Sequence, residues 1–251
     1  MLHIIDTVNK KKMKKGGFGI EILYPGEALS NPSDSGLAGI GRIDQARVNP
    51  GTLIPMHPHR NDEILTYIRT GRVKHTDSGG NTEIISSQRL MLMNAGAEFQ
   101  HEEQVLEDSE AHTALQIFIR PEEGDMAPNV QFHDFTDIYS LDHWRKIAGK
   151  TQDFPLKFRS STAVYDMRMQ GETIKGLPQK ALNNKSLTFL FYVFEGEVEV
   201  DDKILLKSGE SLLIKEESPE FRAIKESDVV LFATEEKAQF FKNGMYSGNQ
   251  M

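Results

Sequence analysis

The sequence predicts an all-β protein built from two antiparallel β-barrels in tandem, joined by one short helix. Many short runs of apolar and β-branched residues follow one another closely, separated by turns rich in Gly, Pro and Asn. Helical periodicity is almost absent outside one short segment in the middle of the chain. The strand–turn–strand pattern of the first half also returns in the second half, as two similar barrels would require.

Composition narrows the class of protein. At 251 residues the chain is long enough for one large or two ordinary domains. Its formal net charge of -8 argues against an obligatory nucleic-acid partner, because phosphate binding needs a basic surface. No apolar run approaches the about 18 residues of a membrane-spanning helix, and the N-terminus does not look like a secretory signal. The absence of cysteine excludes disulfides and thiolate metal sites. We therefore expect a cytoplasmic protein without a membrane segment.

A run of lysines at residues 10–15 stands out near the N-terminus. A solvated basic turn accounts for it, and a nuclear-targeting or anion-binding patch is the alternative. A leading strand and turn are expected around this run.

The strands of the first half are predicted from short apolar runs bounded by turn residues. They cover residues 40–48, 64–69, 73–75, 82–85, 90–93, 99–103 and 112–120. The turns between them include residues 49–51 and a hairpin loop at 77–81. Strands this short and this closely spaced favour a closed antiparallel barrel or a sandwich.

The segment that joins the two halves begins with a linker at residues 121–128. A short connecting helix is predicted at residues 140–148, because Ser140 can cap its first turn and Gly149 stands where a helix would end. From about residue 163 the strand pattern returns.

An internal repeat is visible in two places. Residues 67–73 match residues 192–198 at an offset of 125 (192 minus 67), and residues 89–93 match residues 210–214 at an offset of 121 (210 minus 89). We therefore divide the chain into an N-terminal barrel, residues 1–125, and a second unit, residues 126–251, which contains the linker helix and the C-terminal barrel.

Two pairs of metal-ligating residue types lie at opposite ends of the segment 51–103. His57 and His59 are separated by one residue, as are His101 and Glu103. Residues two apart on a strand point to the same face, and the proline between the two histidines favours extended geometry. Two such strands in one barrel would bring three imidazoles and one carboxylate together. That ligand set suits a divalent transition metal and leaves room for solvent or substrate.

The aligned positions of the second half carry none of these ligands. The offsets place Leu182, Asn184 and Thr188 opposite His57, His59 and Glu63, and they place Arg222 and Ile224 opposite His101 and Glu103. No histidine occurs after His143. The sequence therefore predicts metal binding in the N-terminal barrel alone.

The segment 51–103 resembles the pirin family of the cupin superfamily. The pattern Gly51-x5-His57-x-His59-x3-Glu63 follows the first cupin motif, and the stretches at 75–81 and 95–103 add to the match. The likeness is closest to the bacterial pirins associated with quercetinase activity. It implies a bicupin, with a metal in the N-terminal barrel only.

The resemblance also implies how the metal is held. His57, His59, His101 and Glu103 would bind one divalent ion, usually regarded as iron, Fe(II), in this family, although Mn, Co, Ni, Cu or Zn would suit the same ligand types. The carboxylate ligand of pirins comes from the second motif, so Glu103 is taken as the ligand. Glu63, which ligates in many other cupins, is left as an alternative ligand or as a residue behind the ligands.

Other residues of this segment have less specific expectations. His75 is expected to be structural or exposed in a hairpin, and His112 to be a strand residue rather than a fifth ligand. Apolar side chains that could line a substrate pocket above the metal are Met56, Met91, Met93, Phe99 and Phe118. Ordinary barrel core is the alternative for these five, because small barrels fill their interiors with side chains.

The function implied by the resemblance is a quercetin (flavonol) 2,4-dioxygenase-type oxidoreductase, which acts on a small phenolic substrate with dioxygen. Glu103 would take the proton of the flavonol 3-hydroxyl, the metal would act as Lewis acid and template, and carbon monoxide and a depside would be released. The alternative is a metal- and redox-dependent regulatory module that binds a protein partner without turnover. Fold alone does not decide between them.

Overall fold

The N-terminal half consists of a seven-stranded and a four-stranded sheet. The computed structural model describes residues 1–178 and 186–251. In spatial order, the large sheet contains β12 (Asn129–Asp134), β9 (Arg89–Asn94), β6 (Glu63–Thr70), β11 (His112–Ile119), β4 (Ile40–Val48), β3 (Phe18–Leu23) and β2 (Lys11–Lys15). The small sheet contains β5 (Leu53–His59), β10 (Phe99–Val105), β7 (Val73–Asp77) and β8 (Thr82–Ile85).

The C-terminal half repeats this arrangement. Its large sheet contains β1 (Leu2–Ile5), β20 (Ser211–Lys215), β17 (Leu187–Glu195), β22 (Ser227–Glu235), β15 (Thr162–Met169), β13 (Arg145–Gly149) and β14 (Leu156–Lys157). Its small sheet contains β16 (Ile174–Lys175), β21 (Phe221–Ala223), β18 (Glu197–Val200) and β19 (Ile204–Lys207). The order β9-β6-β11-β4 matches β20-β17-β22-β15, so the predicted repeat is confirmed in the described residues.

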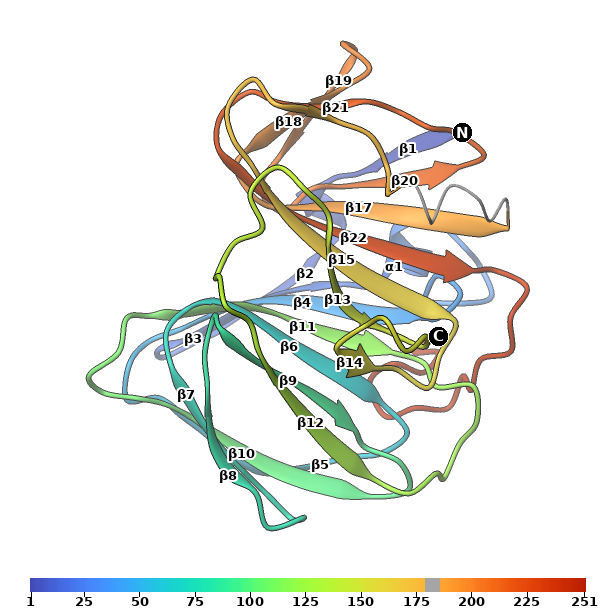
Figure 1. Ribbon diagram of the computed structural model, residues 1–251. Helices are drawn as coiled ribbons and strands as arrows, with labels where there is room; N and C mark the ends of the chain where they lie inside the picture. The colour runs from blue at the N-terminus through green and yellow to red at the C-terminus, as the bar shows by residue number, and fades with distance from the viewer. Residues whose placement is uncertain (179–185) are drawn as a thin grey trace.

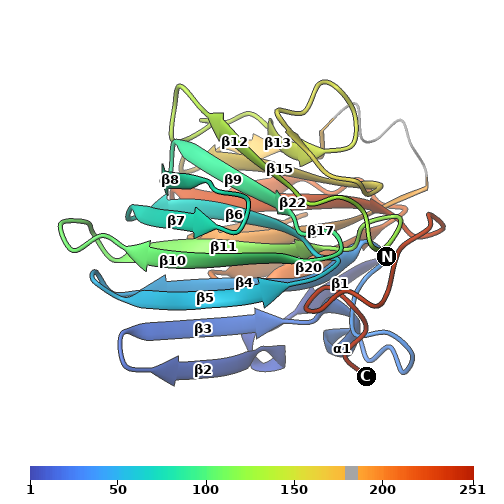
Figure 2. The same ribbon diagram turned by 90° about the horizontal axis from the view of Figure 1, so that it is seen from below.

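The two large sheets face each other across the middle of the molecule, and the small sheets lie on the outside (Figure 1). The prediction of an all-β bicupin is confirmed, but closed barrels are wrong in detail. Each half is a cupin-type β-sandwich whose large sheet keeps free edges, with β2 at one edge of the N-terminal sheet and β12 at the other (Figure 2). All five residues of β2 are exposed, and charged lysines on an edge strand disfavour further pairing. The lysine run is thus mostly an edge strand rather than a turn.

The predicted helix at residues 140–148 is wrong. Ser140 does not cap a helix; its hydroxyl donates to the carbonyl of His143 in a turn. The chain then enters β13, where Arg145 pairs with Asp166 of β15 and the apolar residues that follow are buried in the sheet. Tertiary pairing therefore overrides the local helix signal. The helices of the described residues are a single 3-10 turn, Thr7–Asn9, and α1, Pro25–Ala28.

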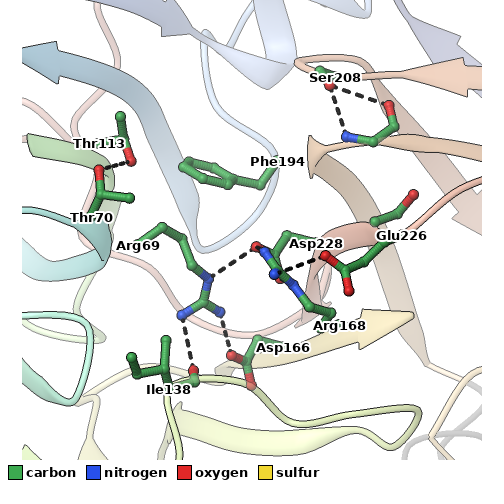
Figure 3. A network of polar contacts seen from close by, with 12 residues as sticks. Arg69, Thr70, Thr113, Ile138, Asp166, Arg168, Phe194, Ser208, Glu226 and Asp228 are labelled. Carbon is green, nitrogen blue, oxygen red and sulfur yellow. Dashed lines mark hydrogen bonds and ion pairs between the residues drawn. The ribbon is translucent and has the colours of Figure 1, made fainter. Parts of the chain in front are cut away.

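Side chains on β6 alternate between the two faces of the sheet. One face contacts the C-terminal half, and the other faces the interior of the N-terminal sandwich. Tyr67 and Arg69 point toward the C-terminal half, where the phenol and the guanidinium donate to Asp166 at 2.9 and 2.6 Å. Arg69 also lies 3.6 Å from Asp228, which Arg168 holds in turn (Figure 3). The intervening residues of β6 point into the sandwich.

Each half supplies an edge strand to the other. β1, at the start of the chain, pairs with β20 of the C-terminal sheet. β12, which follows the N-terminal half, pairs with β9 of the N-terminal sheet. The division at residue 125 remains a prediction about folding units; in space the two halves exchange strands. Among the described residues, no helix has the length and apolar character needed to cross a bilayer.

Candidate metal centre

Two antiparallel strands of the small sheet bring the predicted histidines together. β5 pairs with β10 so that His57 lies opposite His101, while His59 lies opposite Phe99. The ring centroids of the three histidines are 4.4 to 4.9 Å apart in every pair. The spacing of two residues along β5 thus produces the shared face that the sequence predicts.

The nitrogen atoms of this cluster fit a single cation. The Nε2 atoms of His59 and His101 are 3.0 Å apart, and one candidate ligand atom from each of the three histidines lies within 4.8 Å of the others. Two nitrogens that each lie about 2.1 Å from one ion, at a right angle, are about 3.0 Å from each other. The spacing of these imidazole nitrogens therefore suits a single divalent cation.

Burial keeps two of these imidazoles, those of His57 and His101, neutral, which is the form that binds metal. Burial lowers the pKa of His101 far below its usual value, and the neighbouring histidines add to this effect. Burial also lowers the pKa of His57, although a hydrogen bond with the Pro55 carbonyl opposes the shift. At neutral pH both rings offer a nitrogen lone pair rather than a positive charge.

The second nitrogen of two of the rings has a partner or a neighbouring carboxylate. His57 Nδ1 lies 2.9 Å from the Pro55 carbonyl, so it donates and leaves Nε2 as the ligand atom. His59 Nδ1 lies 3.7 Å from Asp62 Oδ2, which is too long for a hydrogen bond but close enough for electrostatic attraction. Asp62 is fixed by the C-terminal tail, because it accepts hydrogen bonds from Tyr246 and Ser247.

His101 is supported by a chain of two side chains from β7. His75 Nε2 lies 2.9 Å from Asp77, and His75 Nδ1 lies 3.4 Å from His101 Nδ1. With Asp77 ionised, His75 donates to it, His101 donates to His75, and the lone pair on His101 Nε2 is left facing His59. Burial alone would raise the pKa of Asp77, but its hydrogen bonds with His75 and Asn81 hold that pKa below its usual value. His75 is fully buried rather than exposed.

Glu103 stands on the other side of His101. Its Oε1 lies 4.0 Å from His101 Nδ1, and together with His75 these residues form a second group of potential ligands. Oε1 has no hydrogen-bond partner among the described residues, whereas Oε2 accepts from Gln116 at 3.4 Å. Burial raises the pKa of Glu103 to about 7, against the opposing effect of Gln116. The carboxylate thus borders the histidine cluster, although it is grouped with His101 and not with His57 and His59.

Glu63 points away from the cluster. It lies on the same face of β6 as Tyr67, toward the C-terminal half, and its Oε2 accepts a hydrogen bond from the backbone N–H of Arg159 at 2.6 Å. Burial raises its pKa to about 7, although the hydrogen bonds with Arg159 and Asn94 oppose the shift. The structure places Glu63 in the interface between the halves, outside both ligand groups.

A cavity of about 340 Å³ opens beside the ligands, between the large and small sheets of the N-terminal half. Its wall is largely apolar and includes Phe18, Ile20, Ile22, Val48, Ile54, Val73, Val105, Ala114 and Phe118. The polar lining consists of Arg42, Asp44, His57, His59, Thr66, Glu103, His112 and Gln116. Tyr246 of the C-terminal tail closes one side, with its ring 5.2 Å from that of His59.

Of the five apolar pocket candidates, the structure places Phe118 in the wall of this cavity and the other four elsewhere. Met56 is 46% exposed, because it alternates with His57 on β5 and points outward. Met91, Met93 and Phe99 are buried in the core instead of lining the cavity.

The C-terminal half shows a different use of the aligned positions. In the described part of the chain, both groups of potential ligands lie in the N-terminal half. Leu182 and Asn184 lie outside the described residues. Arg222, aligned with His101, forms an ion pair with Glu199.

Sequence reasoning missed four contributors to the site. Asp62 and Tyr246 meet only because the last residues of the chain fold back against the first motif, and no local pattern signals that approach. His75 and Asp77 belong to the segment 75–81 of the family resemblance, so that stretch contained a signal whose role only the fold reveals.

The N-terminal half, which contains the histidine cluster, is similar to known proteins. Residues 34–119 match the family model named Pirin. The quercetin 2,3-dioxygenase of Escherichia coli K12 is 32% identical over 108 residues, which cover 43% of this chain and 47% of that protein. The match thus spans about half the length of this relative. A provisionally named quercetin 2,3-dioxygenase of Pasteurella multocida is 26% identical over 193 residues, covering 76% of this chain and 80% of that protein.

Solved structures show the same fold over nearly the whole chain. The crystal structure of YhhW from Escherichia coli has a TM-score of 0.79 at 22% identity and covers 93% of this chain and 97% of that one. The structure of the bacterial pirin YhhW in complex with nickel(II) has a TM-score of 0.78 at 21% identity, covering 94% of this chain and 99% of that one.

Fold and site together define a bicupin with a histidine cluster of metal-site geometry in its N-terminal half. The match to the pirin family model covers residues 34–119, the part of the chain that contains His57, His59 and His101.

Proposed function

We propose that this protein is a metal-dependent oxidoreductase of the quercetin 2,4-dioxygenase type, with a flavonol as substrate and dioxygen as co-substrate. The observation that carries the proposal is the cluster of His57, His59 and His101 beside a largely apolar cavity. The relatives named quercetin 2,3-dioxygenase support the choice of substrate class. Iron(II) is the proposed ion, and the nickel complex of a structural neighbour supports a divalent metal.

The residues have distinct roles in this proposal. The three histidines, with Glu103 beside His101, would hold the ion, and the ion would supply Lewis acidity and a template for substrate binding. Glu103 Oε1, which has no partner among the described residues, accepts the proton of the flavonol 3-hydroxyl. The apolar wall around Phe118 orients the flat substrate and excludes water from the reacting end.

The test is aerobic incubation of quercetin with protein loaded in turn with Fe, Mn, Co, Ni and Cu. We expect the flavonol absorbance to bleach with at least one metal and carbon monoxide to be released. His57→Ala should lose both metal affinity and bleaching, because one imidazole ligand is removed. Arg222→Ala, in the C-terminal half, should change neither.

Stoichiometric metal binding without bleaching by any of the five metals would contradict the proposal. That outcome would favour the alternative, a metal- and redox-dependent regulatory module that binds a protein partner. Stoichiometric metal binding by His57→Ala would instead contradict the ligand assignment.

A further inference from the structure

The cavity wall contributed by β11 has a polar group at a distance from the metal ligands. His112, Ala114, Gln116 and Phe118 alternate along this strand and all line the cavity. Gln116 donates to Glu103 and therefore marks the end of the wall that borders the ligands. His112 lies four residues away, which is about 13 Å along an extended strand.

His112 is held rigidly at this position. Thr70 of β6 donates its hydroxyl hydrogen to the carbonyl of Ala111 at 2.6 Å. Its Oγ1 lies 2.7 Å from that of Thr113 (Figure 3), so contacts hold the chain on both sides of His112. Gly71, at φ +85°, permits close approach, because a Cβ there would lie 2.7 Å from the Cα of His112. A backbone held in this way suits recognition by the His112 side chain, since little backbone freedom is lost on binding.

One nitrogen of the His112 ring is buried without a partner. The side chain is 8% exposed, and Nδ1 makes no hydrogen bond to any of the described residues. The backbone of Thr70 lies near the ring and opposes the effect of burial on its pKa. Burial lowers the pKa of His112 to about 4, so the ring is neutral at neutral pH. A neutral ring carries a hydrogen on one nitrogen and a lone pair on the other, so Nδ1 accepts from a hydroxyl when the hydrogen is on Nε2.

The wall between His112 and the ligands is apolar. Val48 lies opposite His112 on β4, and Ala114 follows on β11. Val73 and Val105 of the small sheet line the same cavity. A flat apolar body would fit between these side chains, with polar groups needed only at its two ends.

We infer that His112 Nδ1 accepts a hydrogen bond from a hydroxyl at the far end of the substrate, so that the cavity selects flat phenols with a hydroxyl distant from the metal-binding oxygen. The inference rests on the proposed function for the metal-binding end of the substrate. It assigns a specificity determinant outside both ligand groups. A site that hydrogen-bonds a substrate hydroxyl rejects analogues without it, because its own buried acceptor is then left unpaired.

The test compares two flavonols on Ni(II)-loaded protein without oxygen, so that binding is measured apart from turnover. Quercetin carries hydroxyls at both ends, whereas 3-hydroxyflavone carries only the metal-binding pair of oxygens. Dissociation constants follow from the shift in flavonol absorbance. We expect the unmodified protein to bind quercetin at least about tenfold more tightly. His112→Leu should reduce this ratio to about one, with 3-hydroxyflavone binding unchanged.

Two further variants control for folding and for the loss of a histidine. His112→Gln keeps an acceptor oxygen and should retain part of the preference. His133→Leu, on β12 and outside the cavity wall, should retain all of it. Metal content and thermal midpoint verify that each variant is folded and loaded.

The outcomes separate the two proposals. An unchanged preference in His112→Leu overturns the inference about His112. If both flavonols bind with the expected ratios but neither is consumed in air, the proposed oxygenase activity is contradicted and the inference about His112 still holds. Failure of the unmodified protein to bind either flavonol overturns both.

Discussion

At the scale of single residues, His101 connects two sets of groups. Its Nε2 faces His59, while its Nδ1 faces His75 and Glu103. The ring can serve as a ligand only if its proton is on Nδ1, and the pair His75–Asp77 fixes the proton there. The precision of the site therefore depends on residues that do not contact the ion.

Removing this support should weaken metal binding without abolishing it. We expect His75→Leu and Asp77→Asn to lower metal affinity by about 10- to 100-fold, since residues behind the ligands have effects of this size. Competition with a chromophoric chelator would measure the change, and His133→Leu is the matched control. Unaltered affinity in both variants would mean that His75 and Asp77 have only a packing role.

Glu63 makes stability depend on pH. Burial raises its folded pKa from 4.5 to about 7, so the folded state holds a proton that the unfolded state releases between these values. The contribution of this group is fully present below pH 4.5 and is lost as pH rises through 7. Glu63→Gln should therefore gain stability relative to the unmodified protein at pH 8, by about 3 kcal/mol at most.

Urea denaturation at pH 5 and pH 8 would measure this difference. Glu98→Gln is the control, because Glu98 is exposed. An equal stability difference for Glu63→Gln at both pH values would show that ionisation of Glu63 does not contribute.

Residue spacing predicted the histidine cluster but not its surroundings. His57 and His59 share a face because a strand repeats every two residues, and that rule needs no tertiary information. The roles of Asp62 and His75 depend on the C-terminal tail and on β7, whose approach is set by the whole fold.

At the scale of elements, the alternation of side chains along a strand explains which predicted pocket residues face the cavity and which do not. Parity correctly puts Phe118 with Gln116 on the cavity side of β11. The same rule would have excluded Met56, which must point away from its neighbour His57. The helix at 140–148 failed for another reason, since pairing of β13 with β15 outweighs capping signals worth about 1 kcal/mol.

The C-terminal tail is an element whose position depends on Gly41 in β4. A Cβ at this residue would lie 2.2 to 2.7 Å from the backbone of Ser247, so the tail would have to move. Because Ser247 holds Asp62, we expect Gly41→Ala to lower both the thermal midpoint and the metal affinity. Gly176→Ala, with open space around the position, is the control and should change neither. Full metal affinity in Gly41→Ala would show that the position of the C-terminal tail does not affect metal binding.

At the scale of the whole molecule, a buried ionic network joins the halves. Asp166 is completely buried and accepts hydrogen bonds from Tyr67, Arg69 and Arg145. Figure 3 shows Asp166 and Asp228 together with Arg69 and Arg168. Loss of this carboxylate leaves two guanidinium groups without their partner in a poorly solvated interface.

We therefore expect Asp166→Ala to lower the free energy of unfolding by about 3–5 kcal/mol. Arg222→Ala removes an ion pair on the surface of the small C-terminal sheet and should have little effect. Urea denaturation with a single reporter in each half would measure both variants. A change below about 1 kcal/mol in Asp166→Ala would mean that water replaces the lost carboxylate.

The repeat predicted that the two halves share one architecture, yet it could not predict the exchange of edge strands. Short β1 and β12 carry no signal that tells which large sheet each one joins. Their partners, β20 and β9, are themselves related by the repeat. The exchange is therefore symmetrical in space although the strands differ in sequence.

This exchange has a consequence during synthesis on the ribosome. The strand Leu2–Ile5 leaves the exit tunnel about 200 residues before residues 211–215, which contain its hydrogen-bonding partners. During that interval the strand remains unpaired, and chaperones can bind it.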